Sequence, residues 1–218
     1  MTPRGARPLV VFDLDGVIAR TDTMAYLLRR QLFSQPGRAV AGAVPAALWF
    51  LLHRYPRARP RLSRALGRAA LSGLSAEQYA RLARRAGELL GSDPARRIPD
   101  GVSAIRRHLD AGDEVVITTG TESTLARAFL DSLGLSGVEL VATDIRFDHF
   151  VVRYENHNLG SGKVRGFASR QIDLFYTDSD LDLPIAKLSR RTVLVNPTER
   201  LAGVFRAQIP ELEIVRWA

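Results

Sequence analysis

Residues 8–17 read Pro-Leu-Val-Val-Phe-Asp-Leu-Asp-Gly-Val, and this stretch decides the fold. Its first half is a short apolar run rich in β-branched residues, and it ends abruptly in two acids and a glycine. Such a run is typical of a strand that is buried on both faces of a parallel sheet. Asp13 and Asp15 are then expected at the carboxyl end of the strand, the edge at which open α/β sheets bind ligands.

Further apolar runs follow at residues 114–119, 173–177 and 191–195. Between them lie stretches with helical periodicity at 99–110 and 121–133, the second of which ends at Gly134. Strands that alternate with helices predict an α/β fold, in which helices flank a parallel sheet on both faces. The pattern between residues 138 and 158 favours strands and predicts a β-hairpin or a small extension of the sheet.

Residues 21–98 differ in composition from the rest of the chain, because alanine, leucine and arginine dominate and no strand-like alternation occurs. We therefore predict an inserted all-helical cap at 21–98 and a catalytic core formed by 1–20 and 99–218. Residues 39–52 of the cap carry no charge, but the segment is shorter than the ~20 residues that a membrane span requires, and Pro45 interrupts it. We expect a core helix of the cap here, with an interfacial membrane contact as the alternative.

The chain carries a net charge of +8, and 29 of its 31 basic residues are arginine. A basic surface attracts anions, including nucleic acid, acidic lipid headgroups and phosphorylated small molecules, although a solvated surface rich in arginine has the same composition. The sequence has no cysteine, which excludes disulfides, thiolate metal sites and a cysteine nucleophile. No leader pattern precedes the first strand, so a cytoplasmic location is expected.

Two acidic clusters, at residues 13–17 and 177–182, follow apolar runs. In the first cluster, the carboxylate of Asp13 can attack phosphorus when a metal screens the charge repulsion. Asp15 can then protonate the leaving oxygen and later take a proton from water. In the second, Asp178 is the expected direct ligand of magnesium, and Asp182 is expected to act through a water or to orient Asp178. Taken singly, these clusters are also compatible with turn chemistry and with a solvated helix start.

Two further signals are suited to phosphate. Thr119 and Gly120 end an apolar run ahead of a predicted helix, where a hydroxyl and free N–H groups form a phosphate cradle, or where the threonine simply caps the helix. Lys163 stands among glycines in a predicted loop, which favours a compact point charge over the planar fork of arginine.

Taken in order, these four signals resemble the four motifs of the haloacid dehalogenase superfamily, in its phosphoserine-phosphatase-like branch, subfamily IB. The resemblance implies a Rossmann-like core with a helical cap inserted after the first acid pair. It implies that Asp13 is the nucleophile and forms an aspartyl-phosphate, with Asp15 as general acid and then base. Asp13, the backbone carbonyl of Asp15 and Asp178 would bind Mg²⁺, with Asp182 in support, while Thr119, Gly120 and Lys163 would hold the phosphoryl group.

The resemblance leaves the substrate open. Val17 replaces the threonine common in phosphatases of this type, and Gly16-Val17 also occurs in sugar phosphomutases, so a phosphomutase is the first alternative to a phosphomonoester hydrolase. Phosphoserine is disfavoured, because Gly120-Thr-Glu lacks the paired glycines of phosphoserine phosphatases and Asp22 stands near their substrate-binding glutamate.

The apolar, arginine-rich cap resembles that of phosphatidylglycerophosphate phosphatases. We therefore expect a phosphorylated small molecule or a lipid as substrate, with peripheral membrane contact through the cap, and we disfavour nucleic acid as a partner. A non-catalytic basic binding protein is the remaining alternative.

Overall fold

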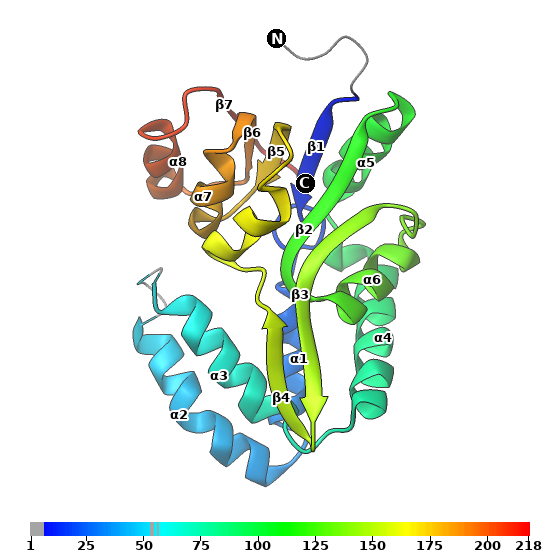
Figure 1. The fold of residues 1–218 in the computed structure, drawn as a ribbon, viewed down its shortest axis with the longest axis vertical. Coiled ribbons are helices and arrows are strands. Elements are labelled where there is room, and N and C mark those ends of the chain that lie inside the picture. The colour runs from blue at the N-terminus through cyan, green and yellow to red at the C-terminus, as the bar shows by residue number, and fades with distance from the viewer. Residues whose placement is uncertain (1–6, 53–54, 56) are drawn as a thin grey trace.

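This computed structural model describes residues 7–52, 55 and 57–218. They form a seven-stranded sheet with helices on both faces, and a helical region adjoins the sheet at one end (Figure 1). The strands are β1 (Leu9–Asp13), β2 (Glu114–Glu122), β3 (Glu139–Asp148), β4 (Val151–Asn156), β5 (Ile172–Thr177), β6 (Ser189–Val195) and β7 (Leu212–Val215). The α-helices are α1 (Thr23–Leu32), α2 (Pro36–Leu52), α3 (Arg59–Leu71), α4 (Ala76–Ser92), α5 (Pro99–Asp110), α6 (Ser123–Ser132), α7 (Leu183–Ala186) and α8 (Glu199–Arg206). Short 3-10 helices are η1 (Pro94–Arg96), η2 (Gly160–Phe167) and η3 (Asp180–Asp182).

Strand β1 lies at the centre of the sheet, whose order is β4-β3-β2-β1-β5-β6-β7. It pairs in parallel with β2 and β5, and all five of its residues are buried, as the apolar run predicts. The register sets Asp13 opposite Thr118 of β2. The residues that follow β1 and β2 therefore meet at one edge of the sheet.

Successive residues of β1 contribute to two separate hydrophobic cores. Val10 and Phe12 pack in a core with α5 and α6, whereas Leu9 and Val11 pack in a core with η2, α7 and α8. Because side chains alternate between the faces of a strand, helices cover both faces of this sheet. The predicted α/β class is confirmed.

The sheet also differs in detail from the prediction. β2 continues past Thr119 to Glu122, and the hairpin predicted between residues 138 and 158 is the antiparallel pair β3 and β4. The short edge strand β7, which pairs in parallel with β6, was not predicted. Its four residues are exposed or half-buried, so the sequence carries no continuous apolar run there.

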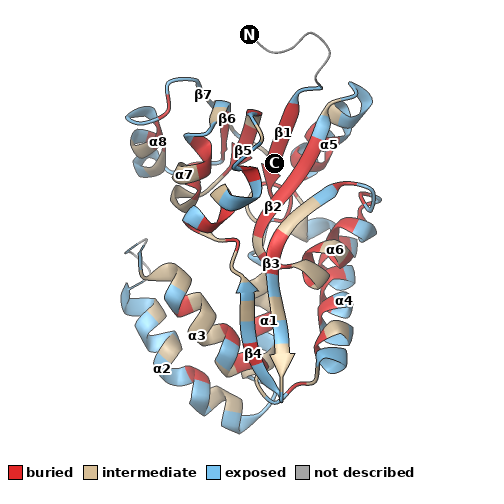
Figure 2. Ribbon diagram, viewed as in Figure 1, coloured by how far each residue is buried: buried red, intermediate tan, exposed pale blue. Residues whose placement is uncertain are grey.

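The predicted helical region contains α1 to α4 and has a hydrophobic core of its own. That core is built from α1, α3 and α4, and it includes Leu125 of α6 and Val152 of β4. Figure 2 shows the buried residues concentrated on the strands and on the helices that flank them, whereas α2 is largely exposed. The helical cap is thus anchored to the sheet through α6 and the β3–β4 hairpin.

His157 connects the cap to the segment that carries Lys163. Its Nε2 lies 3.3 Å from Oγ of Ser63 on α3. Burial lowers the pKa of His157 to about 4, and the positive charges of Arg64 and Arg165 add to this effect. The folded protein therefore keeps this ring neutral near pH 7.

This histidine predicts a pH-dependent stability. In the unfolded chain His157 takes up a proton near its ordinary pKa of 6.5, whereas in the folded chain it does so only near about 4. The contribution of the neutral ring to the free energy of unfolding is therefore fully present above pH 6.5 and is lost as the pH falls towards 4. Between pH ~7 and ~5, we expect the free energy of unfolding to fall by roughly 1 to 2 kcal/mol more in the wild type than in His157→Gln. Urea denaturation at both pH values measures the difference, and equal pH slopes in the two proteins would contradict it.

Candidate active site

Lys163 joins carboxylates that come from two different strand ends. Its Nζ lies 2.9 Å from Oδ1 of Asp13, at the end of β1, and 2.8 Å from Oδ1 of Asp182, in η3 after β5. All three side chains are buried. The fold therefore brings together three charged groups that sequence reasoning had assigned to one site.

The charge of Lys163 is stabilised by its partners. Burial alone would lower the pKa of this lysine, but Asp13 and Asp182 raise it above its ordinary value, so the ammonium group stays charged. Thr177 donates a hydrogen bond of 2.8 Å to Asp182 and fixes that carboxylate. One prediction is corrected here, because Lys163 lies in η2 rather than in a loop. Asp182 bonds Lys163 directly, and its expected support of the magnesium site stays a prediction.

Asp178 lies directly against the turn that follows Asp13. A Cβ placed on Gly16 would lie only 1.8 Å from Oδ2 of Asp178, and the φ angle of Gly16 is +77°. Glycine is therefore required here for two reasons, the backbone conformation and the approach of the carboxylate. Burial raises the pKa of Asp178 to about 7, and repulsion from Asp182 adds to it.

Negative charge exceeds positive charge in this cluster. The pKa of Asp13 is raised well above its usual value, first by burial and then by Asp182 and Asp178, while Lys163 opposes the shift. Three carboxylates thus share one ammonium group, an imbalance that a bound divalent cation would relieve.

The donors at this edge suit a hard cation. Carboxylates of Asp13 and Asp178 supply the oxygen ligands that Mg²⁺ prefers. Across the described parts of the chain, three or more acidic or histidine side chains nowhere form a metal site by themselves. The set predicted from sequence, two carboxylates and one backbone carbonyl, does not need a third such side chain.

Asp15 is held at both oxygens. Its Oδ1 accepts a hydrogen bond of 2.9 Å from the backbone N–H of Thr23, the first residue of α1, and its Oδ2 accepts one of 3.0 Å from Oγ1 of Thr121. The two threonine hydroxyls lie 2.8 Å apart. Burial raises the pKa of Asp15 to about 7, and the nearby charge of Asp22 adds to the shift.

The predicted phosphate cradle at a helix N-terminus is wrong in its geometry. Thr119 lies inside β2, and its Oγ1 accepts a hydrogen bond of 3.0 Å from the N–H of Thr121. The helix begins only at Ser123, and the side chain of Glu122 caps it by accepting from Leu125 N.

Thr119 and Gly120 nevertheless lie at the ligand-binding edge, because Thr118 is the register partner of Asp13. Their contact with phosphoryl oxygens stays a prediction. Asn158, which sequence reasoning missed, fixes this strand end through bonds of 3.0 Å to Oγ1 of Thr118 and to the carbonyl of Thr119. Neither Asn158 nor the pair Thr23 and Thr121 stands in a recognisable motif, since their roles depend on tertiary contacts.

The cap reaches the site through an ion pair. Arg59, the first residue of α3, donates hydrogen bonds of 2.6 and 3.3 Å to the two oxygens of Asp180. Asp180 is the first residue of η3, and Ser179 caps this helix. The ion pair therefore places the start of α3 beside the strand end that carries Asp178.

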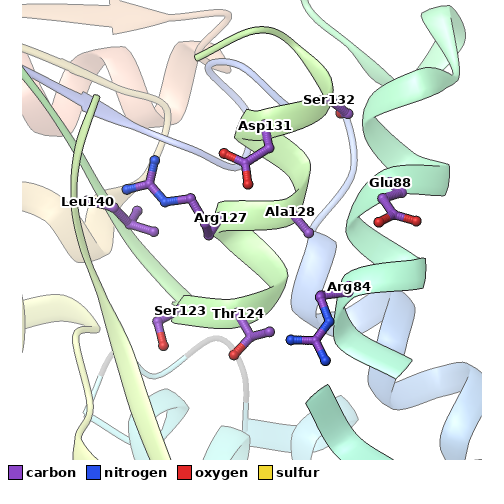
Figure 3. A pocket seen from close by; sticks show the side chains of 9 residues that line it. All are labelled: Arg84, Glu88, Ser123, Thr124, Arg127, Ala128, Asp131, Ser132 and Leu140. Carbon is purple, nitrogen blue, oxygen red and sulfur yellow. The ribbon is translucent and has the colours of Figure 1, made fainter. Parts of the chain in front are cut away.

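A hollow of about 570 Å³ lies elsewhere, between α4, α6 and β3 (Figure 3). Arg84 and Glu88 of α4 line it on one side, and Ser123, Thr124 and Arg127 of α6 line it on the other. It contains none of the residues predicted for catalysis. The chemistry is therefore assigned to the charged edge of the sheet and not to this hollow.

Comparison with known proteins gives a family match. Residues 10–187 match the haloacid dehalogenase-like hydrolase family. The protein named phosphoserine phosphatase SerB1 of Mycobacterium tuberculosis is 31% identical over 161 residues, which cover 69% of this chain and 52% of that protein. The chain thus spans about half the length of the curated relatives that it matches.

Solved structures share the fold. A protein of unknown function from Bordetella pertussis Tohama I superposes with a TM-score of 0.71 at 22% identity, covering 96% of this chain and 98% of that one. A phospho-aspartyl intermediate analogue of phosphoserine phosphatase superposes with a TM-score of 0.54 at 12% identity, covering 95% and 93%. At these identities the structures show the fold alone.

The contact between Gly16 and Asp178 yields a prediction with a matched control. Gly112 has a similar φ of +82°, but a Cβ there would meet nothing within 4 Å. Gly112→Ala should therefore cost about 1 kcal/mol of stability through backbone strain alone. Gly16→Ala should cost clearly more, because the Asp178 carboxylate must also move. Thermal unfolding of the two variants measures this, and equal losses would contradict the contact.

Proposed function

Because the chain belongs to the haloacid dehalogenase-like hydrolase family, we propose that it is a magnesium-dependent phosphatase of the phosphoserine-phosphatase-like branch. It would hydrolyse a phosphate monoester through a phosphoryl group held covalently on Asp13. The observation that carries this proposal is the buried bridge from Lys163 to Asp13 and Asp182, with Asp178 against the adjoining turn. Such positioned charges stabilise the negative charge that spreads over the phosphoryl oxygens during transfer.

Asp13 has the geometry of a nucleophile. Its Oδ1 accepts hydrogen bonds of 2.9 Å from both Lys163 Nζ and Leu14 N, and these bonds fix the plane of the carboxylate. Its Oδ2 would attack phosphorus, forming an O–P bond to Asp13 while the bond from phosphorus to the ester oxygen breaks. The positive charge of Lys163 would stabilise the negative charge of the phosphoryl oxygens.

Asp15 would move the proton. In the first step it would donate a proton to the departing ester oxygen, and in the second it would remove one from the water that attacks the phosphoryl group. The O–P bond to Asp13 then breaks and releases inorganic phosphate. The bonds from Thr23 and Thr121 hold Asp15 in place for both transfers. Since Thr23 belongs to the cap and Thr121 to β2, cap and core jointly position this carboxyl group.

Magnesium would be held by Asp13, Asp178 and the backbone carbonyl of Asp15, with Asp182 in support. When bound, the ion neutralises charge on the phosphoryl oxygens and on the crowded carboxylates. The excess of three carboxylates over one ammonium group supports this assignment.

The substrate is assigned here only by class, as a phosphorylated small molecule or a phosphorylated lipid. The name of the tuberculosis relative supports a phosphate monoester. Asp22, which stands near the position of a substrate-binding glutamate, caps α1 by accepting a hydrogen bond of 2.8 Å from Ala25 N. A carboxylate engaged in this way is poorly placed to bind the ammonium group of phosphoserine, and we propose a different leaving group.

One prediction of the proposed function concerns the nucleophile. Asp13→Asn should lower kcat for a generic ester such as p-nitrophenyl phosphate by about 10³-fold or more, because an amide cannot form the covalent intermediate. The fold should survive, since the amide oxygen can still accept a hydrogen bond from Lys163 and Asp182 still pairs with its charge. Asp131→Asn, at an exposed position on α6, is the matched control and should keep full activity. An active Asp13→Asn enzyme would refute the nucleophile.

Another prediction of the proposed function concerns the metal. Removing divalent ions with a chelator should abolish turnover, and added Mg²⁺ should restore it. Free phosphate should be the product, measured by a phosphate-release assay on a panel of esters. Undiminished turnover in chelator would contradict the metal role, and an isomerised sugar phosphate without free phosphate would show a mutase instead.

A further inference from the structure

Helix α2 turns its apolar side chains away from the protein. Val40, Val44, Leu48 and Leu51 are 75%, 68%, 41% and 64% exposed. Their spacing of four, four and three residues places them on a single face of the helix. In Figure 2, α2 lies at the outer edge of the cap and is mostly coloured as exposed. We call these four residues the α2 face.

The opposite side of α2 packs against the rest of the cap. Gly42 is the one buried residue of this helix, and a Cβ on it would lie 2.4 Å from Leu32 of α1. Arg38, Pro45 and Trp49 share this side and are half-buried. The prediction that residues 39–52 form a core helix of the cap is therefore wrong, because the core of the cap is made by α1, α3 and α4 instead.

The chain segment that contains the α2 face is cationic. From Thr23 to Ala76 the sequence contains nine arginines and no aspartate or glutamate, whereas the rest of the chain has 22 basic and 23 acidic residues. The net positive charge of the protein therefore arises from α1, α2, α3 and their connections. Of the described arginines in this segment, Arg29, Arg30, Arg57, Arg61 and Arg68 are exposed.

From this combination we propose that the α2 face docks on an anionic lipid bilayer. Apolar side chains enter the boundary between headgroups and acyl chains, and exposed arginines of the same helical segment pair with acidic headgroups. Within the described residues, no helix is both long and apolar enough to cross a bilayer, so α2 lies in the plane of the interface. The aliphatic α2 face and the exposed arginines of the same helical segment together match the apolar and the anionic layers of such a surface.

Two other binding partners, a second copy of the chain and a nucleic acid, fit the α2 face less well than a lipid bilayer does. A second copy of the chain would bring two segments that carry only positive charge against each other, which opposes association. Nucleic acid would pair with the arginines and could stack on Phe50 of α2, which is 77% exposed, but it would leave the four aliphatic side chains of the α2 face without a favourable partner. Charge and apolarity together therefore favour the lipid surface.

The location of the face relates docking to the active site. α3, which follows α2 in the chain, begins at Arg59, and Arg59 contacts Asp180 beside the candidate site. The C-terminal end of α2 thus lies towards the edge of the sheet where the carboxylates gather (Figure 1). The docking itself does not depend on catalysis and is tested without it.

Co-sedimentation of the full chain with vesicles tests the proposal. Phosphatidylcholine vesicles with and without phosphatidylglycerol serve as the probe, at low and high salt. We expect binding to the anionic vesicles, weakened by salt, and little binding to the neutral ones. The double change Val44→Glu and Leu51→Glu should weaken binding about tenfold or more. Leu109→Glu, at a position on α5 that is 40% exposed, is the matched control and should bind as the wild type does.

Folding and catalysis are checked separately. Thermal unfolding verifies that the variants fold, and Val44→Ser with Leu51→Ser is a second pair that should also weaken binding without adding charge. Activity on p-nitrophenyl phosphate should be unchanged in both pairs. Wild-type protein that ignores anionic vesicles, or double variants that bind them equally well, would overturn the proposal. So would a dimer that both pairs abolish in sedimentation velocity while vesicle binding is absent.

Discussion

The structure of the candidate site depends on one buried cation. Lys163 is 2% exposed, and its charge is tolerated there only because Asp13 and Asp182 lie within hydrogen-bond distance of it. A buried charge whose partner is removed typically costs about 3 to 5 kcal/mol, so the three residues hold one another in place. Because they come from β1, η2 and η3, this interaction also fixes how the ends of β1 and β5 and the segment after β4 meet. The contact of Lys163 with Asp13 and Asp182 therefore joins these parts of the fold and, in the proposed mechanism, also orients the nucleophile.

The cap completes the site from the other side. Thr23 at the start of α1 binds Asp15, and Arg59 at the start of α3 binds Asp180. Both contacts are made by the first residue of a cap helix, so a small movement of the cap would displace both. The outward apolar face of α2 belongs to the same helical region. In the proposed function, proton transfer by Asp15 and docking of the α2 face would both involve the cap, while phosphoryl transfer would take place at the edge of the sheet.

Much of the fold could be predicted from the sequence because the core strands are continuous apolar runs. β1 and the acids that follow it obey the rule that buried parallel strands end at a ligand-binding edge, and Gly16 marks the turn. β7 escaped prediction because it is a short edge strand without a buried run. The start of α6 was misplaced because Thr119 and Glu122 are both plausible helix caps, and only the structure shows that Glu122 has that role. The environment of α2 was misjudged because composition alone does not say which way an apolar face points.

The most direct test of the account is to find where the phosphoryl group resides during turnover. The enzyme is quenched in acid while it turns over an ester with Mg²⁺, and its peptides are analysed by mass spectrometry. The account predicts one added phosphoryl group on the peptide that contains Asp13, and none on the same peptide from Asp13→Asn. Phosphate release at full rate with no label on that peptide, or with the label on another residue, would contradict it.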